Sequence, residues 1–440
     1  MPAPDEITAP QPARRPGGPV TPTLGEAACE WARIGVLSFG GPAAQIALMH
    51  RIVVEERAWL TERRFLDALS FCMLLPGPEA MQLATYAGWR LHGVVGGLVA
   101  GLLFVLPGAV VMLGLSCLYA LYGTVPSVEA LFLGIKAAVL VIVVEALLRV
   151  AKRALLRPLH WGLAGAAFVA IFFLALPYPL VIAAAALIGA VAGAAGQGDA
   201  APPLAVTPVR TLRTVTVWLG VWLVPLLALD MIAPGSILGE IGRFFSVLAT
   251  VTFGGAYAVL AFMAQDAVAG FGWLGAGEMM DGLGLAETTP GPLILVTQFV
   301  GFLAAARDEG GVSLAMGLAG AGVTLWATFA PCFLWIFAGA PYIDWIGTRP
   351  RLRGALAGIT AAVVGVILNL SLWFALHVFF GTVTRESAGP LTLWVPQLAT
   401  LDWRVPVIAG VAGVLLLRLH RGLVPTLAVC AALGLLLGAL

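Results

Sequence analysis

Long apolar segments separated by short polar connections follow one another along most of the chain. Stretches without any charged residue cover 94–128, 158–198, 214–229, 244–265, 288–306, 310–343, 354–384 and 422–440. A helix that crosses the hydrocarbon core of a bilayer needs about 20 apolar residues. The stretch 158–198 has room for two such helices, and Pro177 and Pro179 divide it. The pattern predicts an all-α polytopic membrane protein.

Composition narrows the class further. Of the 440 residues, 60% are hydrophobic and 11% are charged, whereas a soluble domain has about 25% charged residues. The 24 basic and 23 acidic side chains could not cover a water-soluble surface, which excludes a soluble enzyme, a nucleic-acid-binding domain and a disordered chain. Continuous apolar runs also argue against an outer-membrane barrel, whose strands alternate. The five cysteines are scattered without metal-ligand spacing, so neither a metal nor another cofactor is expected.

Two motifs occur twice, with the same spacing between them. Phe39-Gly40-Gly41-Pro42 recurs 214 residues later as Phe253-Gly254-Gly255-Ala256, and Pro76-Gly77-Pro78 recurs at the same distance as Pro290-Gly291-Pro292. Farther along, residues 134–139 match residues 358–363, 224 positions later. Self-similarity of this kind indicates an internal duplication.

The duplication divides the chain into four segments. They are a disordered cytoplasmic tail (1–23), a first repeat (24–200), a linker with a connecting transmembrane helix (201–235) and a second, inverted repeat (236–440). The tail is rich in Pro and Ala and has no apolar core, so it does not resemble a cleaved signal. Each half has six apolar elements: 30–50, 65–91, 93–120, 128–155, 159–176 and 178–196, then 240–265, 276–305, 311–340, 352–380, 403–419 and 422–440.

Basic residues predict that the two copies are inverted. Lys and Arg accumulate on the cytoplasmic side of a membrane. In the first half they follow the first and fourth elements, whereas in the second half they follow the third. The charges agree best with nine full spans and four re-entrant hairpins, with the N-terminus inside and the C-terminus outside. Thirteen full spans are the alternative.

The repeated motifs predict breaks inside membrane segments. Pro-Gly-Pro removes two N–H donors and interrupts a helix, and in a bilayer such a break is tolerated where it faces protein or a water-filled cavity. A helix that begins after the break points free N–H groups and a positive dipole end at that cavity, which favours an anion. Inverted-repeat transporters hold anionic substrates in this way. The alternative is that the breaks are kinks that serve packing.

Polar groups near the breaks are the candidate ligands of the anion. The predicted substrate-binding residues are Ser38, Phe39, Gly40, Gly41, Gln45, Gly77, Gln82, Lys136, Gly254, Gly255, Thr288, Thr289 and Gly291. For each hydroxyl, a bond to a carbonyl of its own helix is the alternative interpretation. Lys136 lies eight residues into its element, about 12 Å along a helix, so we expect it to face the interior and balance an anion or a carboxylate.

Few carboxylates lie at membrane depth. Glu79 follows the first Pro-Gly-Pro motif and Glu287 precedes the second, so both are candidates for carrying a coupling proton. Glu79 could instead stabilise a helix N-terminus. Asp67 and Asp281 occupy matching positions and are interpreted as charges at helix N-termini. Arg33 either reaches an anion from the cytoplasmic mouth or marks the interface.

Several of these motifs resemble those of the chromate ion transporter family, in its long two-domain form. The resemblance extends from about residue 25 to the C-terminus, and its most specific segment is residues 284–294. The family pattern falls on Phe39, Gly40, Gly41, Pro42, Pro76, Gly77, Pro78, Phe253, Gly254, Gly255, Glu287, Thr288, Thr289, Pro290, Gly291 and Pro292. Ala256 departs from the first copy, which has Pro42, and follows the family's looser second-half pattern.

The resemblance implies a multi-pass inner-membrane protein, and no enzyme, that moves chromate out of the cell. It further implies proton-driven antiport, chromate resistance and sulfate as a competitor or alternative substrate. An anion channel on the same fold is the alternative. The expected partners are chromate and the lipid bilayer, with no nucleic acid, and a homodimer is possible for a transporter of this size.

Overall fold

The computed structural model describes residues 22–194, 208–253, 256–308, 310–343, 345 and 349–438. Most of the predicted tail, part of the predicted linker, and Gly254 and Gly255 lie outside the described residues. Within these ranges the chain is predominantly helical.

The helices of the first half are α1 (Leu24–Leu37), α2 (Gly41–His50), α3 (Glu62–Cys72), α4 (Glu79–Tyr122), α5 (Pro126–Ala154), α6 (Pro158–Phe172) and α7 (Tyr178–Gly193). The remaining α-helices are α8 (Pro208–Ile232), α9 (Ile237–Val251), α10 (Ala256–Met263), α11 (Ala276–Thr288), α12 (Val296–Ala306), α13 (Leu314–Gly339), α15 (Pro350–Phe379), α16 (Arg404–Gly413) and α17 (Leu423–Gly438). Short π-helical turns extend α2, α10 and α16 over Arg51–Glu56, Ala264–Gly270 and Val414–Arg418, and 3-10 turns cover Leu293–Leu295, Ala340–Tyr342 and Leu398–Thr400.

Five helical segments of the described chain are long and apolar enough to cross a bilayer. They are Glu79–Tyr122, Pro126–Ala154, Pro208–Ile232, Leu314–Tyr342 and Pro350–Phe379. Four shorter apolar segments accompany them: Pro158–Phe172, Tyr178–Gly193, Leu293–Ala306 and Leu423–Gly438. The chain is therefore a multi-pass helical membrane protein, as its hydrophobic pattern predicts.

Helix α4 consists of two helices that meet at a sharp turn. His92 and Gly93 leave the helical region there, and Gly93 has a φ of 64°, which a residue without a Cβ adopts readily. The turn falls between the predicted elements 65–91 and 93–120. The first part of α4 therefore lies with α3 in the predicted element 65–91, and the second part is the predicted element 93–120.

A β-hairpin departs from the predicted all-α fold. Strand β1 (Val383–Ala388) pairs antiparallel with β2 (Leu391–Pro396), and Thr384 faces Val395 across the ladder. The turn between them contains Gly389, with a φ of 63°. The sequence pattern predicts no element between 352–380 and 403–419, where the apolar runs are short. Thr392 of β2 is buried, and its amide donates to the carbonyl oxygen of Phe173 at 2.6 Å.

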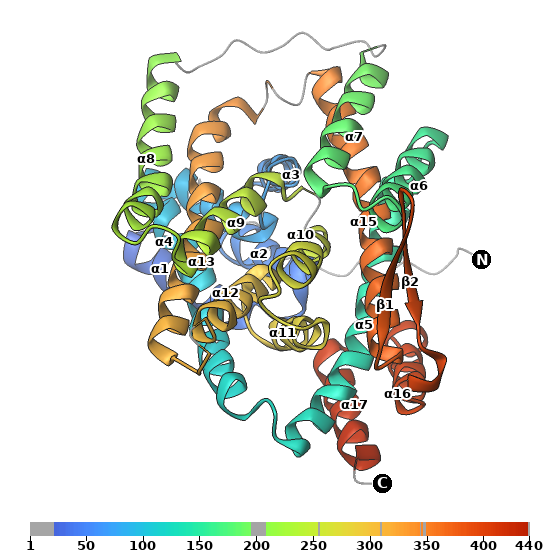
Figure 1. The fold of residues 1–440 in the computed structure, drawn as a ribbon. Helices are drawn as coiled ribbons and strands as arrows, with labels where there is room; N and C mark the ends of the chain where they lie inside the picture. Colours follow the sequence, from blue (N-terminus) through green and yellow to red (C-terminus); the bar gives the residue numbers. More distant parts are fainter. Residues whose placement is uncertain are drawn as a thin grey trace, which may run out of the picture.

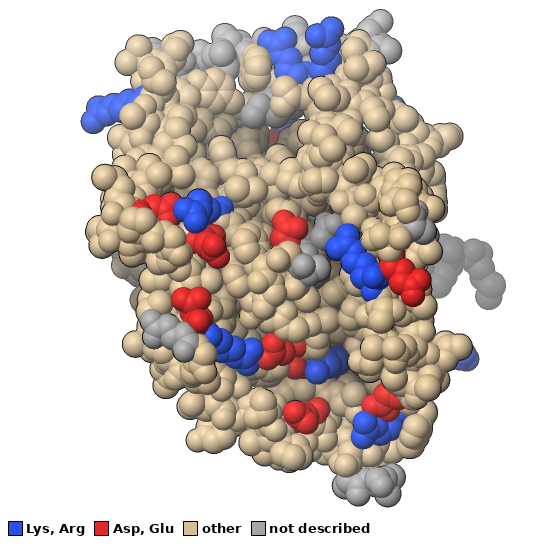
Figure 2. Space-filling model, in the orientation of Figure 1, with Lys and Arg blue, Asp and Glu red and all other residues tan. Residues whose placement is uncertain are grey.

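The long helices form two groups with the shorter, broken helices between them (Figure 1). Helix α13 packs against α4, α8, α9 and α12, whereas α15 packs against α5, α6 and α7. Helices α10, α11 and α12 lie between these groups (Figure 1). Most of the visible surface carries no charge, and in its lower half basic and acidic side chains lie next to one another (Figure 2).

The fourth predicted element of each half packs against the last helix of the other half. A Cβ added at Gly134 of α5 would lie 1.9 Å from the carbonyl oxygen of Cys430 in α17. At the matching position of the second half, a Cβ at Gly358 of α15 would lie 2.4 Å from the carbonyl oxygen of Ala185 in α7. Backbones can approach so closely only where the side chain is a hydrogen atom, which is how small residues stabilise helix pairs in membranes.

Candidate anion-binding site

The four helix breaks meet in two pairs, and each pair joins the two halves of the chain. The amide of Gly77 donates to the carbonyl oxygen of Thr252 at 2.8 Å, and the amide of Gly291 donates to the carbonyl oxygen of Ser38 at the same distance. Ser38 and Thr252 occupy matching positions of the repeat, as do Gly77 and Gly291. The two hydrogen bonds are therefore counterparts of each other.

Glycine at the second and fourth breaks is required by backbone conformation. Gly77 has a φ of 116° and Gly291 a φ of 88°, values that cost a residue with a side chain about 1–3 kcal/mol. The neighbouring helix also comes close, because a Cβ added at Gly108 of α4 would lie 2.0 Å from the carbonyl oxygen of Pro290. The fourth break is therefore in direct contact with a long helix of the first half.

Two glutamine amides tie the breaks to their surroundings. Gln45 Nε2 donates to the carbonyl oxygen of Gly291 at 2.6 Å, and Gln82 Nε2 donates to that of Pro76 at 2.7 Å. Both side chains are buried. Their Oε1 atoms have no hydrogen-bond partner among the described residues. In this arrangement the amides satisfy carbonyl groups that the interrupted helices leave without helical donors.

The hydroxyls predicted to face the anion donate instead to carbonyls of their own helices. Ser38 Oγ donates to Ile34 at 2.6 Å, and Thr288 and Thr289 donate to Leu285 and Ala286 at 2.8 and 3.1 Å. This is the alternative that the sequence left open for each of them. The hydroxyls contribute to the ends of α1 and α11 in this conformation.

The remaining predicted ligands lie at the first break. Phe39 is 41% exposed, and Gly40 and Gly41 have φ values of 84° and 77° where α2 begins. Their counterparts Gly254 and Gly255 lie outside the described residues.

The carboxylates beside the Pro-Gly-Pro motifs have different environments. Glu287 is buried near the end of α11 and accepts a hydrogen bond from the hydroxyl of Tyr257 at 2.8 Å. Glu79 is partly buried and is the first residue of α4. Arg33, for which the sequence suggests a place at the cytoplasmic mouth or at the interface, forms an ion pair with Glu30 at 3.4 Å.

Lys136 pairs with a carboxylate in the interior. Its Nζ lies 3.2 Å from Asp281 Oδ2, and the Tyr119 hydroxyl donates to the same oxygen at 2.7 Å. Asp281 is 3% exposed and is not the helix-terminal charge that its position in the sequence suggested, because it is the sixth residue of α11. Its repeat counterpart Asp67 is exposed and lies 3.9 Å from Arg63.

The ion pair borders a cavity of about 540 Å³. The end of α4 and the starts of α5, α11 and α16 contribute to its walls. Its charged lining consists of Glu129, Lys136, Glu278, Asp281, Arg307 and Arg404. Arg307 is 2.7 Å from Glu278, and Arg404 is 2.7 Å from Asp402. Hydrogen bonds from Arg404 lower the pKa of Asp402, which lies in the loop before α16.

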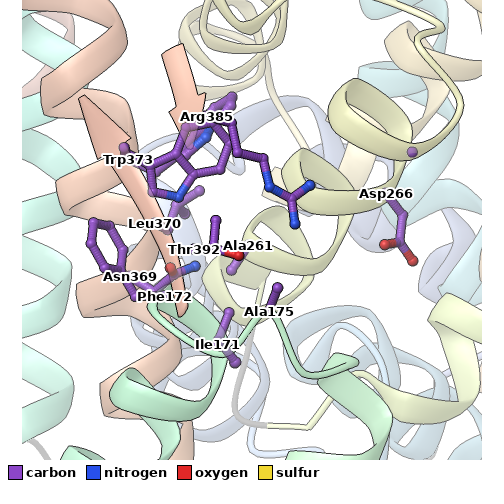
Figure 3. Close-up of a pocket in the computed structure, with 12 residues that line it drawn as sticks. Ile171, Phe172, Ala175, Ala261, Asp266, Asn369, Leu370, Trp373, Arg385 and Thr392 are labelled. Atoms are coloured by element: carbon purple, nitrogen blue, oxygen red, sulfur yellow. The ribbon is translucent and has the colours of Figure 1, made fainter. Parts of the chain in front are cut away.

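A smaller cavity of about 210 Å³ lies under the β-hairpin. Arg385 reaches from β1 toward the side where Asp266 lies, and Asn369 and Thr392 are also part of the wall (Figure 3). The guanidinium of Arg385 also lies 5.9 Å from the ring centre of Trp394. This cavity therefore combines one basic, one acidic and several aromatic groups.

The structure brings the breaks together and places Lys136 apart from them. Asp281, the partner of Lys136, precedes Thr288 by seven residues, about 10 Å along α11. Sequence reasoning missed Tyr119, Tyr257 and the burial of Asp281, because each contact joins residues far apart in the chain. The one available signal was that an aspartate recurs at matching positions of the two halves.

The fold and this arrangement define a polytopic membrane protein with paired broken helices, the class to which many secondary transporters belong. The chain belongs to the chromate transporter family, whose model matches residues 25–190 and 239–437, in the family's long two-domain form.

Three curated relatives cover most of the chain. A probable chromate transport protein of Synechococcus elongatus is 31% identical, over 87% of this chain and 93% of its own. Chromate transport proteins of Cupriavidus metallidurans and Pseudomonas aeruginosa are 30% and 33% identical, over 79% and 76% of this chain and 81% and 77% of their own. No solved structure matches the chain significantly.

Proposed function

We propose that this protein is a secondary active transporter that exports chromate across the inner membrane, driven by the proton gradient, and so confers chromate resistance. Relatives named as chromate transport proteins match at least three quarters of the chain, which supports chromate as the substrate. Sulfate, a tetrahedral dianion of similar size, is the proposed competitor.

The observation that carries the proposal is the pairing of the four breaks. A transporter needs a substrate site that either side of the membrane can reach, and broken helices provide it where two repeats meet. The hydrogen bonds between Gly77 and Thr252 and between Gly291 and Ser38 join the repeats at their interrupted segments. Movement of one repeat against the other would break these bonds and free the amides for an oxyanion.

The substrate ligands in this proposal are those expected from the sequence: the glycine amides, the hydroxyls and the amides at the breaks and, at a distance from the breaks, Lys136. Glu79 and Glu287 are the candidate carriers of the coupling proton. Glu287 is buried and accepts a hydrogen bond from the Tyr257 hydroxyl of helix α10, so a proton on Glu287 would lie between two of the broken helices.

We further propose an inverted repeat with nine spans and four re-entrant hairpins, as expected from the sequence. Each of the paired contacts has a counterpart with the halves exchanged, as a twofold relation between the repeats requires. Labelling tests the inversion. Tyr122→Cys and Arg349→Cys, each in a background without native cysteines, should react with membrane-impermeant maleimide from opposite sides of sealed vesicles. Reaction of both from the same side would contradict the inverted repeat.

Radiolabelled flux into proteoliposomes tests the function itself. Chromate uptake should require the protein, rise when a pH gradient is imposed and fall when sulfate is added in excess. Flux that ignores the pH gradient but follows the membrane potential would favour an anion channel on the same fold. Sulfate flux with no chromate flux would favour a transporter of another oxyanion. Cross-linking in the same vesicles would detect the possible homodimer.

A further inference from the structure

The cavity beside Lys136 has the properties of a second anion site. Lys136 and Asp281 belong to different halves, and the Asp281 side chain is almost completely buried while it borders the cavity. One carboxylate oxygen of Asp281 accepts from Lys136 and Tyr119. The other oxygen, Oδ1, is buried and has no hydrogen-bond partner among the described residues. Burying a carboxylate oxygen without a hydrogen-bond donor costs free energy, so Asp281 is the group that destabilises this cluster.

We propose that a tetrahedral dianion entering this cavity displaces Asp281 from Lys136, and that Asp281 takes up a proton from the water of the cavity as it is displaced. Lys136 then pairs with the dianion. The neutral carboxyl group gains an O–H donor, so its oxygens no longer repel the bound anion. This inference rests on the proposed function and names a site, separate from the helix breaks, where proton and anion binding are coupled.

The charges around Asp281 favour this exchange. The cavity is lined by three basic side chains, Lys136, Arg307 and Arg404, and by three acidic ones, Glu129, Glu278 and Asp281. Arg307 and Arg404 already pair with Glu278 and Asp402. Protonation of Asp281 therefore makes the wall more positive by one charge, and Lys136 is the cation that loses its partner. Uptake of the proton thus removes a negative charge beside Lys136 as the dianion binds, which strengthens the attraction between Lys136 and the dianion.

Tyr119 gives the displaced carboxyl group a second contact. Its hydroxyl donates to ionised Asp281, and after protonation it can accept from the new O–H group. From α4 the residue that faces Asp281 is Tyr119, and from α5 it is Lys136; Glu278 of α11 and Arg307 after α12 are the charged groups nearby. None of the other charged groups has a donor or acceptor role at the Asp281 oxygens in the described structure.

Equilibrium dialysis of the purified full-length protein with radiolabelled chromate tests the coupling. Over a pH range in which chromate stays a dianion, wild-type Kd should rise with pH, by up to about tenfold per pH unit for one linked proton. In Asp281→Asn the Kd should stay constant within about twofold, because asparagine keeps the neutral state at every pH. Asp281→Glu should keep the pH dependence, which shows that a titratable group is required.

Asp67→Asn is the matched control, since Asp67 occupies the same repeat position but is exposed. Its Kd should follow the wild-type pH profile. In proteoliposomes Asp281→Asn should still exchange internal for external chromate, but chromate entry should no longer move protons detected by a trapped pH dye. Exchange also shows that the variant is folded.

An unchanged pH profile in Asp281→Asn, or a flat profile in the wild type, would overturn this inference. Both outcomes are distinct from a failure of the proposed function, in which the wild-type protein would not bind or carry chromate under any condition. If Asp281→Asn bound no chromate while Asp281→Glu bound it with no pH dependence, the pair would be structural and the inference would be wrong.

Discussion

The two copies of the repeat use the same backbone contacts at their helix breaks but differ in the charges on the neighbouring helices. In one copy the aspartate after the first break is buried and paired, as Asp281, whereas Asp67 is exposed in the other. Lys136 of α5 corresponds to Thr360 of α15, whose hydroxyl donates to the carbonyl oxygen of Leu356 at 2.8 Å. The ion pair of Asp281 with Lys136 is largely buried, whereas the ion pair of Asp67 with Arg63 is exposed.

This difference distinguishes residues that the fold requires in both copies from residues that a binding site requires in one copy. Glycine and proline recur in both copies because both sets of helices must be interrupted and must pack closely. A lysine that was needed only for folding would be expected at both positions, since the surrounding backbone is the same. Its presence in one copy therefore favours a role in handling charge, and the substitutions below test that interpretation.

Lys136→Ala should have the largest effect on transport. Removal of one partner of a buried ion pair destabilises a protein by up to about 3–5 kcal/mol, and less where the partner borders a cavity. Chromate flux should fall at least tenfold, which corresponds to about 1.4 kcal/mol. The measurement is initial uptake per reconstituted protein, compared with Thr360→Ala, which should transport at the wild-type rate.

The double variant Lys136→Ala/Asp281→Asn distinguishes loss of fold from loss of site. Without the unpaired carboxylate it should be as monodisperse in detergent as the wild type, yet it should not regain chromate flux. Normal flux in Lys136→Ala would remove Lys136 from the transport pathway.

Much of the fold could be predicted from the sequence, because hydrophobic runs, prolines and glycines act locally. The helices end at Leu37, Cys72, Val251 and Thr288, close to the motifs that predicted the breaks. The β-hairpin was missed for the opposite reason: its strands are short, and it is held partly by the contact between Thr392 and Phe173, 219 positions apart.

Less of the candidate site could be predicted from the sequence. The interior position of Lys136 followed from its depth in an apolar element, but its partner did not, since Asp281 is 145 residues away. The helix hydroxyls were candidate anion ligands from their position, and their bonds to carbonyls depend on side-chain orientation that no pattern records. Pairing of the four breaks likewise depends on how the two halves dock.

Leucine at the repeated glycines should have the next largest effect, and it tests whether the two breaks are equivalent. Gly77→Leu combines strained backbone with a Cβ only 2.9 Å from Gln82 Nε2 and 3.0 Å from Cys332 Sγ. Gly291→Leu has comparable strain, but its nearest contact is Leu295 Cδ1 at 3.3 Å. Each should destabilise by at least about 1–3 kcal/mol, with the larger loss at Gly77.

Thermal stability in detergent and chromate uptake would measure both effects. Gly114→Leu is the control, because Gly114 lies in α4 with no atom within 4 Å of an added Cβ. Wild-type uptake in both break variants would mean that the breaks have only a packing role. Equal losses at Gly77 and Gly291 would mean that the two halves depend on their breaks to the same extent.

Tyr119→Phe should have the smallest effect, and it tests the ion pair of Lys136 and Asp281 directly. The substitution removes one hydrogen bond to Asp281 and no charge, a change of about 1.5–3 kcal/mol for a bond to an ionised group. Because the hydroxyl stabilises the ionised carboxylate, its loss makes Asp281 easier to protonate, and the pH at which chromate binding weakens should move upward. Tyr122→Phe, at an exposed position one turn farther along α4, should leave that pH unchanged. A downward shift in Tyr119→Phe would mean that Tyr119 stabilises the protonated carboxyl group of Asp281 more than the carboxylate.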